Sequence, residues 1–547
     1  MTASAQASYD VAIVGYGPVG ATFANLLAAQ GLSVAVVERS LEIYDKPRAI
    51  VLDHEVLRVF QACGLASFLE RAIAPHPGTQ YLGVDGEVIY EFRRVSPPYP
   101  LGWMPNGSFL QPELEQSLRD KASGRANVDV FLGTQAAAFD QDGDGVTLRL
   151  QGAAAPGVIR ARYLVGCDGA NSFVRKSLDV GMSDLAFDEL WMVVDAWTDA
   201  PTKRPNKCFQ YCWPSRPGTY VPGPGKLRRW EIKLLPGEVA EDFSSNEAIL
   251  NVLGGFTETS DLTIWRSAVY RFHALLARQW RAGRIFLMGD AAHQMPPFLG
   301  QGLSAGIRDA FNLAWKIRFV LAGYAGDRLL DSYQIERSPH VGAVVKAAME
   351  LGEIIGELDP MAAQKRDIRL RAELQSGRSP TVRQKLIPDL HSGLIAPEAK
   401  LAGTLFVQPF VSDNAGGRVR LDDLMRPAFA IVTNSLDVID GLSENAMRFW
   451  QRVGGEVVVI SPIVQAGAAA ALAVAEDGTV FADWLAAHEV TTAVVRPDRY
   501  VFGAAAAPGE LSRLLAALET DLVGQRQERA LPAVGTTPRT KAGKSSL

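Results

Sequence analysis

The chain has 547 residues, too many for one ordinary hydrophobic core, so we expect two or three domains. Its composition, 48% hydrophobic and 21% charged, is typical of a soluble globular enzyme, and its net charge of −5 gives no reason to expect nucleic-acid binding. No apolar run approaches the length of a membrane span, and residues 1–9 lack the pattern of a secretory signal. The four cysteines fit a reducing cytoplasm, and Cys208 and Cys212 have no second pair of ligands nearby, so we expect buried thiols and no metal site.

Residues 10–39 form the stretch around which the rest of the chain is organised. An apolar run of strand length, residues 11–14, leads into Gly15-Tyr16-Gly17-Pro18-Val19-Gly20, which fits the pattern G-x-G-x-x-G. A helical pattern follows, and a second apolar strand at residues 34–37 ends at Glu38 and Arg39. A glycine motif between strand and helix, with an acidic residue at this offset, predicts a dinucleotide-binding unit.

Each part of this unit has a physical task. Gly15 allows the tight turn, Gly17 lets a backbone approach a pyrophosphate, and Gly20 lets the helix pack on the strand. The N-terminus of the helix offers free N–H groups to phosphates, and Glu38 can accept hydrogen bonds from a ribose. This unit alone does not distinguish FAD from NAD(P), and a glycine-rich turn in another α/β unit is the alternative.

The following segments predict further helices and short strands. Residues 46–65 contain a loop with Arg48 and then a helix that Asp53 can cap. Residues 79–110 have the pattern of short strands broken by glycine and proline, and a second helix begins at Gln111.

Two further strand ends carry an aspartate. Residues 128–165 alternate like strands and end before Cys167-Asp168-Gly169-Ala170-Asn171-Ser172. Residues 187–275 look like a separate β layer rich in aromatic residues and proline. A strand at 284–288 then leads into GDAAHQMPPFLGQG, residues 289–302, and a long amphipathic helix. Distant segments of the chain therefore complete the dinucleotide unit, with the β layer inserted between them.

The C-terminal part predicts a third region. Residues 345–400 are helical and charged and have no motif. Strand patterns at 429–432, 456–460 and 492–495 alternate with helical stretches, which predicts a small α/β domain. The polar, basic residues 524–547 are expected to form a disordered tail.

Three motifs stand in one order: GYGPVG…ER at 15–39, CDGANSFVR at 167–175 and GDAAHQMPPFLGQG at 289–302. Together they resemble the FAD-dependent aromatic hydroxylases of the p-hydroxybenzoate hydroxylase class. Residues 47–65, 220–238 and 494–503 further resemble the 3-(3-hydroxyphenyl)propionate hydroxylases.

The resemblance implies an α/β fold in three parts. An FAD-binding, Rossmann-like domain of the glutathione-reductase type would comprise residues 1–78, 111–186 and 276–400. An inserted β-sheet substrate domain would comprise residues 79–110 and 187–275. A C-terminal thioredoxin-like domain would comprise residues 401–523, and because it has no cysteine, disulfide chemistry is excluded for it.

The resemblance also implies roles for single residues. Asp290 would bind the ribityl and phosphate region of FAD, and Asp168 would lie by the pyrophosphate and by NADH or NADPH. Arg48 and Gln111 would contact the sugar and phosphate side of the flavin. The remaining cofactor residues are those that line the isoalloxazine ring or face it from the start of the long helix: Pro296, Pro297, Gly302, Leu303 and Ser304. Helix capping is the alternative for the two aspartates.

Two runs depart from the narrower resemblance. Asp53-His54-Glu55 replaces an acidic pair followed by Glu, and Leu303-Ser304-Ala305 replaces a Tyr-Asn-Ser run. Both runs are expected near the flavin or the substrate, so they leave the exact substrate open.

The function that the resemblance implies is that of a flavoprotein monooxygenase. NADH or NADPH would reduce FAD, and the reduced FAD would use O2 to hydroxylate a phenol ortho to its hydroxyl group. A flavin oxidoreductase that inserts no oxygen and a flavin-binding protein without turnover are the alternatives. A single dinucleotide fingerprint disfavours Baeyer–Villiger chemistry. Small molecules are the expected partners, and a homodimer is compatible with them.

The expected substrate is a small phenol with an acidic side chain, such as 3-(3-hydroxyphenyl)propionate, with another phenol or a polyketide aromatic as the alternative. Neighbouring strand residues point to opposite faces, so only one of Arg228 and Arg229 can face the pocket, and we favour Arg229 as a carboxylate clamp. Tyr270 and His54 are the candidates for polarising the phenol, and Pro297 is the fourth candidate catalytic residue. Structural roles remain the alternative for each of them.

Overall fold

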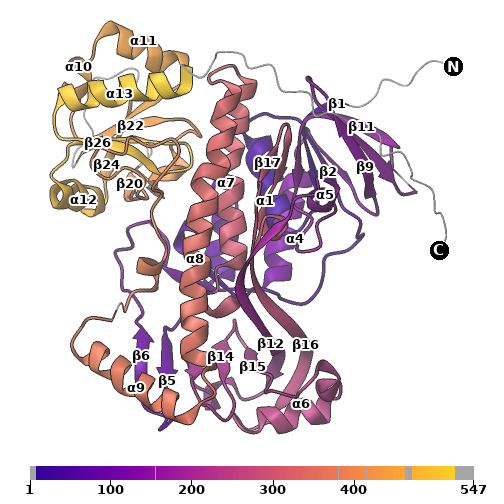
Figure 1. Ribbon diagram of the computed structural model, residues 1–547. Coiled ribbons are helices and arrows are strands. Elements are labelled where there is room, and N and C mark those ends of the chain that lie inside the picture. Colours follow the sequence, from indigo (N-terminus) through magenta and orange to yellow (C-terminus); the bar gives the residue numbers. More distant parts are fainter. Residues whose placement is uncertain (1–7, 154, 380, 413–415, 462–470, 524–547) are drawn as a thin grey trace, which may run out of the picture.

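The computed structural model describes residues 8–153, 155–379, 381–412, 416–461 and 471–523 (Figure 1). The tail expected at 524–547 lies outside these residues. No helix in the described ranges is both long and apolar enough to cross a membrane.

The first sheet brings together three distant segments of the chain. Its main path has the order β17-β18-β11-β1-β2-β8, and β1 is parallel to both β2 and β11. Its strands are β1 (Ser8–Val14), β2 (Val34–Val37), β8 (Val128–Phe131), β9 (Gln135–Gln141), β10 (Val146–Gln151), β11 (Val158–Gly166), β17 (Arg281–Ala282) and β18 (Ile285–Leu287). The central strands β1 and β2 are largely continuous apolar runs, as expected for buried parallel strands.

Long helices hold this sheet against the rest of the molecule. Helices α1 (Pro18–Ala29) and α4 (Gln111–Ser123) pack together, and α1 also contacts α7 (Gly302–Leu321). Helices α7 and α8 (Ser332–Gly356) run side by side through the middle of the molecule (Figure 1). Asp53 caps α2 (His54–Ala62), as expected, because its Oδ1 accepts a hydrogen bond from the Val56 N–H at 3.1 Å.

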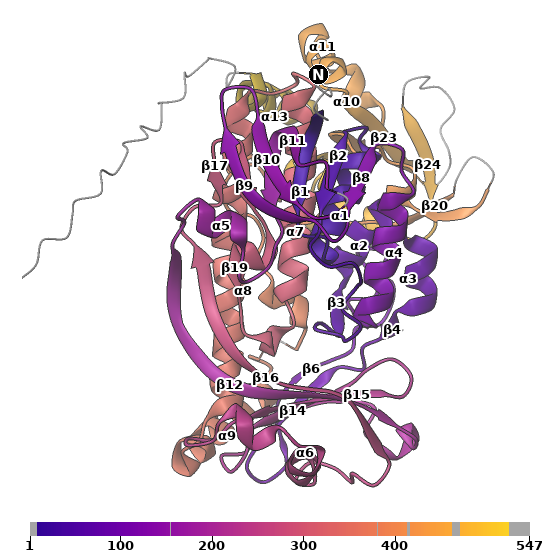
Figure 2. The same ribbon diagram turned by 90° about the vertical axis from the view of Figure 1, so that its right-hand side faces the viewer.

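The second sheet lies below the first, and two long strands connect the two. Its order is β19-β16-β12-β15-β14-β13-β5-β6. Strands β12 and β16 curve from the level of the first sheet down into the second (Figure 2). The strands are β5 (Thr79–Leu82), β6 (Val88–Phe92), β12 (Met182–Thr198), β13 (Cys208–Tyr211), β14 (Gly218–Pro222), β15 (Leu227–Lys233), β16 (Leu262–Ala277) and β19 (His293–Gln294). Helix α6 (Asn246–Leu253) packs against apolar residues on the outer face of this second sheet.

Two segments lie outside the layer in which the sequence placed them. Strand β7 (Asn106–Ser108) does not join the second sheet, because its backbone pairs with β3 (Val51–Asp53) and β4 (Ala74–Pro75). Helix α9 (Pro360–Gln375), expected with the first sheet, packs beside β6 of the second (Figure 1).

The C-terminal region, residues 403–523, is built on a third sheet of order β21-β20-β24-β23-β22-β25-β26. The strands predicted at 429–432, 456–460 and 492–495 correspond to β22 (Ala430–Thr433), β23 (Glu456–Ser461) and β25 (Thr492–Val495). The other strands are β20 (Phe410–Ser412), β21 (Arg418–Arg420), β24 (Leu472–Glu476) and β26 (Val501–Ala505), and the helices are α10 (Asp437–Asp440), α11 (Glu444–Arg452), α12 (Val480–His488) and α13 (Pro508–Val523). One buried cluster joins Trp315 and Phe319 of α7 to Phe429, so this region docks on α7.

Candidate functional site

One cavity of about 440 Å³ connects the glycine-rich turn of the first sheet with the inner face of the second. Its wall includes Gly17, Pro18 and Val19 at one end and Tyr81, Gln210 and Glu231 at the other. This volume is within the range of small-molecule sites, and such sites occur where two layers meet.

The glycine-rich turn fits a pyrophosphate. Gly15 adopts φ +100°, and a Cβ atom on it would lie 2.4 Å from the carbonyl oxygen of Cys167. A Cβ on Gly20 would lie 2.1 Å from the carbonyl oxygen of Gly15. A Cβ on Gly17, by contrast, would meet no described atom within 4 Å. The protein therefore requires glycine at 15 and 20 for its own packing, whereas Gly17 leaves space in front of the N-terminus of α1 for a ligand.

Glu38 and Arg39 follow β2 at the far side of this turn. The Glu38 carboxylate accepts hydrogen bonds from the Tyr16 N–H and the Ser40 N–H, both at 2.8 Å. These bonds orient a carboxylate beside the glycine-rich turn, where a ribose would need an acceptor. Arg39 is exposed, and neither residue lines the cavity.

Arg48 and Gln111 lie together in the cavity wall. The Gln111 side-chain oxygen accepts hydrogen bonds from the Arg48 N–H at 3.0 Å and the Ala49 N–H at 2.7 Å. The Arg48 side chain is exposed and stacks near Tyr44, with no carboxylate at ion-pair distance among the described residues. A free guanidinium at this point suits the phosphates of a dinucleotide.

The two motif aspartates have different environments. The Asp168 carboxylate accepts hydrogen bonds from Ser172 Oγ and from the Val174 N–H, beside the start of the short helix α5 (Phe173–Ser177). The N-cap of α5 is Ser172, so Asp168 supports the cap rather than forming it, and its neighbours Cys167 and Gly169 line the cavity. Asp290 is exposed and lines the cavity directly.

The loop before α7 contributes one wall. Pro297, Gly302 and Leu303 line the cavity, whereas Pro296 and Ser304 are buried behind it. The Ser304 hydroxyl is buried without a hydrogen-bond partner among the described residues. The N-terminus of α7 thus presents its free N–H groups to the cavity, a position that stabilises negative charge on a bound group.

The inner face of the second sheet forms the floor. The strand pairings place five residues in one row across the sheet: Tyr81, Gln210, Thr219, Glu231 and Val193. All five line the cavity. Burial, together with the nearby Asp195, raises the pKa of Glu231 above its usual range, although Arg229 opposes this shift.

Arg229 faces the cavity, but its guanidinium is already engaged. Its Nε and Nη2 donate to the Asp195 carboxylate at 2.7 and 2.9 Å. Its Nη1 and Nη2 also donate to the carbonyl oxygens of Arg48 and Pro47 at 2.7 and 2.8 Å. Four of its five N–H groups are therefore used, and the role of carboxylate clamp is corrected to that of a residue that fixes the loop at 47–48 on the sheet. Arg228 points away, and its Nη1 donates to the Gly225 and Leu227 carbonyls.

The two candidates for polarising a phenol are separated. Tyr270 lines the cavity, with its ring stacked on Phe272 and the Arg266 guanidinium 5.2 Å from its centroid. His54 begins α2 and is not among the lining residues, so the structure does not bring it to the cavity. Burial lowers the pKa of His54 to about 4, and the neighbouring Asp53 opposes this shift.

Sequence reasoning missed His76, Glu231 and Arg383 as cavity residues. Glu231 lies on β15, within the region that the sequence assigned only as a layer, whereas His76 directly follows β4 in a segment without a motif. Arg383 comes from the stretch between 345 and 400 that has no motif, so no sequence signal pointed to it. No group of three or more potential metal ligands occurs within the described ranges.

Comparison with known families gives two matches. A family described as "FAD binding domain" matches residues 8–348, and a family described as "HcaD C-terminal domain" matches residues 403–521.

Two curated relatives align over nearly the whole chain. A probable NADH-specific resorcinol 4-hydroxylase of Rhodococcus jostii (strain RHA1) is 36% identical over 515 residues, which cover 92% of this chain and 93% of the relative. A 3-(3-hydroxy-phenyl)propionate/3-hydroxycinnamic acid hydroxylase of Klebsiella pneumoniae (strain 342) is 32% identical over 554 residues, which cover 98% of this chain and 97% of the relative.

Solved structures share the fold. The flavin-dependent monooxygenase PieE, in complex with FAD and substrate, aligns with a TM-score of 0.78 at 20% identity and covers 95% of this chain and 99% of its own. Aklavinone-11 hydroxylase, with FAD and aklavinone, aligns with a TM-score of 0.72 at 23% identity and covers 95% of this chain and 99% of its own.

Proposed function

Since the chain belongs to the FAD-dependent aromatic hydroxylases, we propose that it hydroxylates a small phenolic acid ortho to its hydroxyl group, using NADH or NADPH and O2. The substrate that we favour is 3-(3-hydroxyphenyl)propionate, and the product is its 2,3-dihydroxyphenyl counterpart. The chain is an NAD(P)H-dependent flavoprotein monooxygenase, and the proposal concerns the substrate, the regiochemistry and the roles of the residues.

The continuity of the cavity from the glycine-rich turn to the second sheet supports this proposal. Gly17, Arg48 and Asp290 line one end, where a dinucleotide would bind, and the polar row on the second sheet lines the other. A flavin held across this junction would face an aromatic substrate on the floor.

The residues of the chain would bind, orient and exclude water. Gly17 and the N-terminus of α1 would hold the pyrophosphate, Glu38 the adenosine ribose, and Arg48 and Asp290 the phosphate and ribityl side. The N-terminus of α7 at Gly302 would stabilise negative charge on the reduced ring. FAD, when bound and reduced, supplies the activation of O2.

The floor of the second sheet would handle the phenol. Tyr270 and Pro297, which both line the cavity, would orient the ring. Glu231 has a raised pKa, so it is a stronger base than an ordinary carboxylate and would accept a hydrogen bond from the phenolic O–H. A phenol whose O–H donates to this carboxylate is more nucleophilic, and it therefore reacts more readily in oxygen transfer.

A neutral phenol is the second candidate substrate. The Rhodococcus relative is named a resorcinol hydroxylase and has the higher identity of the two relatives described above. Resorcinol differs from a phenylpropionate in lacking a carboxylate, so a panel containing both compounds separates the two candidates.

We also propose the three-part division at residues 1–78, 111–186 and 276–400, at 79–110 and 187–275, and at 401–523, with β7 packed on the first part and α9 packed beside the second. The alternation of strands and helices in the C-terminal region supports the thioredoxin-like description, and its lack of cysteine supports a structural rather than a redox role. The low cysteine content supports a cytoplasmic location, and a homodimer is compatible with the proposal.

The test is turnover of the FAD-loaded protein with NADH under ¹⁸O2, with 3-(3-hydroxyphenyl)propionate, resorcinol or no phenol. We expect the phenylpropionate product to gain one ¹⁸O atom, with NADH oxidation accelerated by substrate. NADH oxidation that is independent of any phenol and yields only peroxide would instead indicate an oxidase.

A further inference from the structure

The arginines that line the cavity differ in whether the protein neutralises them. Arg229 and Arg266 both pair with Asp195, and Arg271 pairs with Asp188 at 2.9 Å. Arg48 and Arg383 have no carboxylate at ion-pair distance among the described residues. Since Arg48 lies at the end that fits a dinucleotide, Arg383 is the uncompensated guanidinium at the floor end.

Hydrogen bonds of neighbouring residues in the chain, and one hydrogen bond of its own side chain, fix the position of Arg383. Gln384 Nε2 donates to the Pro105 carbonyl at 2.8 Å, and the Arg93 N–H donates to the Thr381 carbonyl at 2.8 Å. Arg383 Nη2 donates to the Leu299 carbonyl, next to Gly300 in the loop that precedes α7. The Nε atom is buried without a partner, and no described acceptor binds Nη1. The guanidinium of this cavity-lining residue therefore keeps donors that no described acceptor satisfies.

No neighbour of Arg383 in the described ranges forms an ion pair with it, and Asp53, the carboxylate whose charge acts on it from a distance, is already paired with Arg308 at 2.6 Å. Burial lowers the pKa of His76 to about 3 and raises the pKa of Cys208 to about 12, so both are neutral at pH 7. Burial also raises the pKa of Tyr81 well above its usual range, so it too is uncharged. Glu231, the acidic residue of the floor, lies 3.9 Å from Arg229 and not at ion-pair distance from Arg383.

A partly buried cation without a counter-ion is costly unless a ligand supplies the charge. A carboxylate is the group that best satisfies it, because two oxygens can accept two parallel N–H donors of one guanidinium. We infer that Arg383 binds the carboxylate of the substrate side chain and thereby selects phenolic acids over neutral phenols. This inference rests on the proposed function, and it replaces Arg229 with Arg383 as the carboxylate clamp.

The test compares two ligands of similar size and different charge: 3-(3-hydroxyphenyl)propionate and the neutral 3-(3-hydroxyphenyl)propan-1-ol. Binding to the oxidised, FAD-loaded protein is measured by the change in flavin absorption without NADH, and product formation is measured separately. The variants are Arg383→Gln, Arg383→Lys and, as a matched control, Arg93→Gln, which removes a nearby exposed arginine that pairs with Glu91 at 2.6 Å.

We expect Arg383→Gln to weaken binding of the acid at least about thirtyfold and that of the alcohol by less than about threefold. Arg383→Lys should recover part of the affinity for the acid, and Arg93→Gln should bind both ligands like the wild type. Equal weakening of both ligands would overturn the inference, because the guanidinium would then hold the phenolic oxygen or the fold. Unchanged binding of the acid would also overturn it.

The wild type provides a readout that does not depend on the folding of a variant. Wild-type protein that binds the alcohol as tightly as the acid contradicts the inference, whereas a clear preference for the acid supports it. Binding is measured without turnover, so a failure of the proposed function, seen as NADH oxidation without oxygenated product, is distinguishable from a failure of this inference.

Discussion

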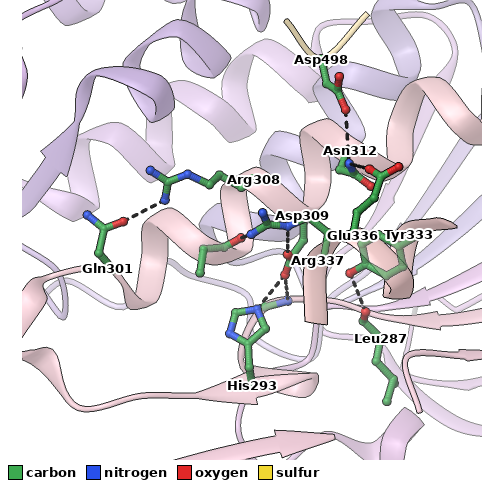
Figure 3. A network of polar contacts seen from close by, with 12 residues as sticks. Leu287, His293, Gln301, Arg308, Asp309, Asn312, Tyr333, Glu336, Arg337 and Asp498 are labelled. Atoms are coloured by element: carbon green, nitrogen blue, oxygen red, sulfur yellow. Dashed lines mark hydrogen bonds and ion pairs between the residues drawn. The ribbon is translucent and has the colours of Figure 1, made fainter. Parts of the chain in front are cut away.

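The cavity differs from the interface that α7 and α8 form with each other and with the C-terminal region in how its arginines are paired. The buried cavity arginines, Arg229 and Arg266, share Asp195, whereas the more accessible ones do not all have a carboxylate partner. At the interface each arginine meets carboxylates: Arg496 pairs with Glu336 at 2.7 Å and with Asp498 at 2.6 Å, and Arg337 pairs with Asp309 at 2.9 Å. Figure 3 shows part of this network around α7 and α8. In the cavity, Arg48 and Arg383 lack such partners.

The same network reaches the start of α7. Arg308 pairs with Asp53 at 2.6 Å and with Glu55, and it donates to Gln301 at 2.8 Å, directly before Gly302. Tyr500 of the C-terminal region donates to Glu55 at 2.8 Å. The arginines that pair with carboxylates of the protein therefore stabilise the fold, whereas the arginines without such a partner indicate where a bound ligand supplies the negative charge.

The largest effect is expected from breaking the paired region. Glu336 is fully buried, and its neighbours Arg496 and Lys316 hold its pKa far below the usual range. Glu336→Gln would leave both cations without this partner, so the free energy of unfolding should fall by about 3–5 kcal/mol in urea titrations. The control Glu519→Gln removes the exposed partner of Arg452 and should cost less than about 1 kcal/mol. Equal losses in the two variants would contradict the distinction.

A pH effect is expected from His54, whose neighbours in the chain, Asp53 and Glu55, both pair with Arg308. Its pKa is about 4 in the folded protein and 6.5 when free, so between these values the unfolded chain binds more protons and stability falls as the pH is lowered from about 6.5 to about 4. The contribution is at most about 3 kcal/mol, at about 1.4 kcal/mol per pKa unit. His54→Asn should therefore show a flatter stability profile in this window than either the wild type or the exposed-residue control His391→Asn. A slope identical to that of the wild type would show that His54 titrates normally.

The glycine-rich turn contains one glycine that leaves space for a ligand, Gly17, and one that the packing of the protein itself requires, Gly20. Gly17→Ala meets no protein atom, so we expect normal thermal stability without FAD but at least about tenfold weaker FAD binding, because a close contact to a charged group is lost. Gly20→Ala meets the Gly15 carbonyl and should lower the melting temperature even without FAD. Calorimetric titration and thermal unfolding of the FAD-free protein measure both effects. Full FAD affinity in Gly17→Ala would refute the assignment of the turn.

The smallest effect is expected for Tyr500→Phe. It removes one hydrogen bond to the buried Glu55, so unfolding should be easier by about 1 kcal/mol. FAD content should not change, because Tyr500 does not line the cavity. A loss of FAD comparable to that in Gly17→Ala would show that the C-terminal region takes part in holding the cofactor.

Periodicity and glycine placement predicted the first sheet well, since the residues that shape it are neighbours in the sequence. The strands before Glu38, Asp168 and Asp290 all lie where the pattern placed them. The segments from 79 to 110 and from 360 to 375 were assigned less well, because their packing partners lie far away in the chain.

The candidate site was predictable only in part, for the same reason. Alternation along β15 correctly separated Arg228 from Arg229, but it could not show that Asp195, a residue of β12, already neutralises Arg229. No sequence pattern around Arg383 predicted its role, because only the three-dimensional structure shows that no described carboxylate lies at ion-pair distance from it.

We propose that one cavity holds FAD at the glycine-rich turn and a phenolic acid on the floor of the second sheet. A crystal structure of the FAD-loaded protein with 3-(3-hydroxyphenyl)propionate tests it most directly. We predict the pyrophosphate at Gly17, the phenol ring between Pro297 and Tyr270, and the carboxylate at Arg383. A phenylpropionate bound outside this cavity, or bound with its carboxylate on Arg229, would contradict the account.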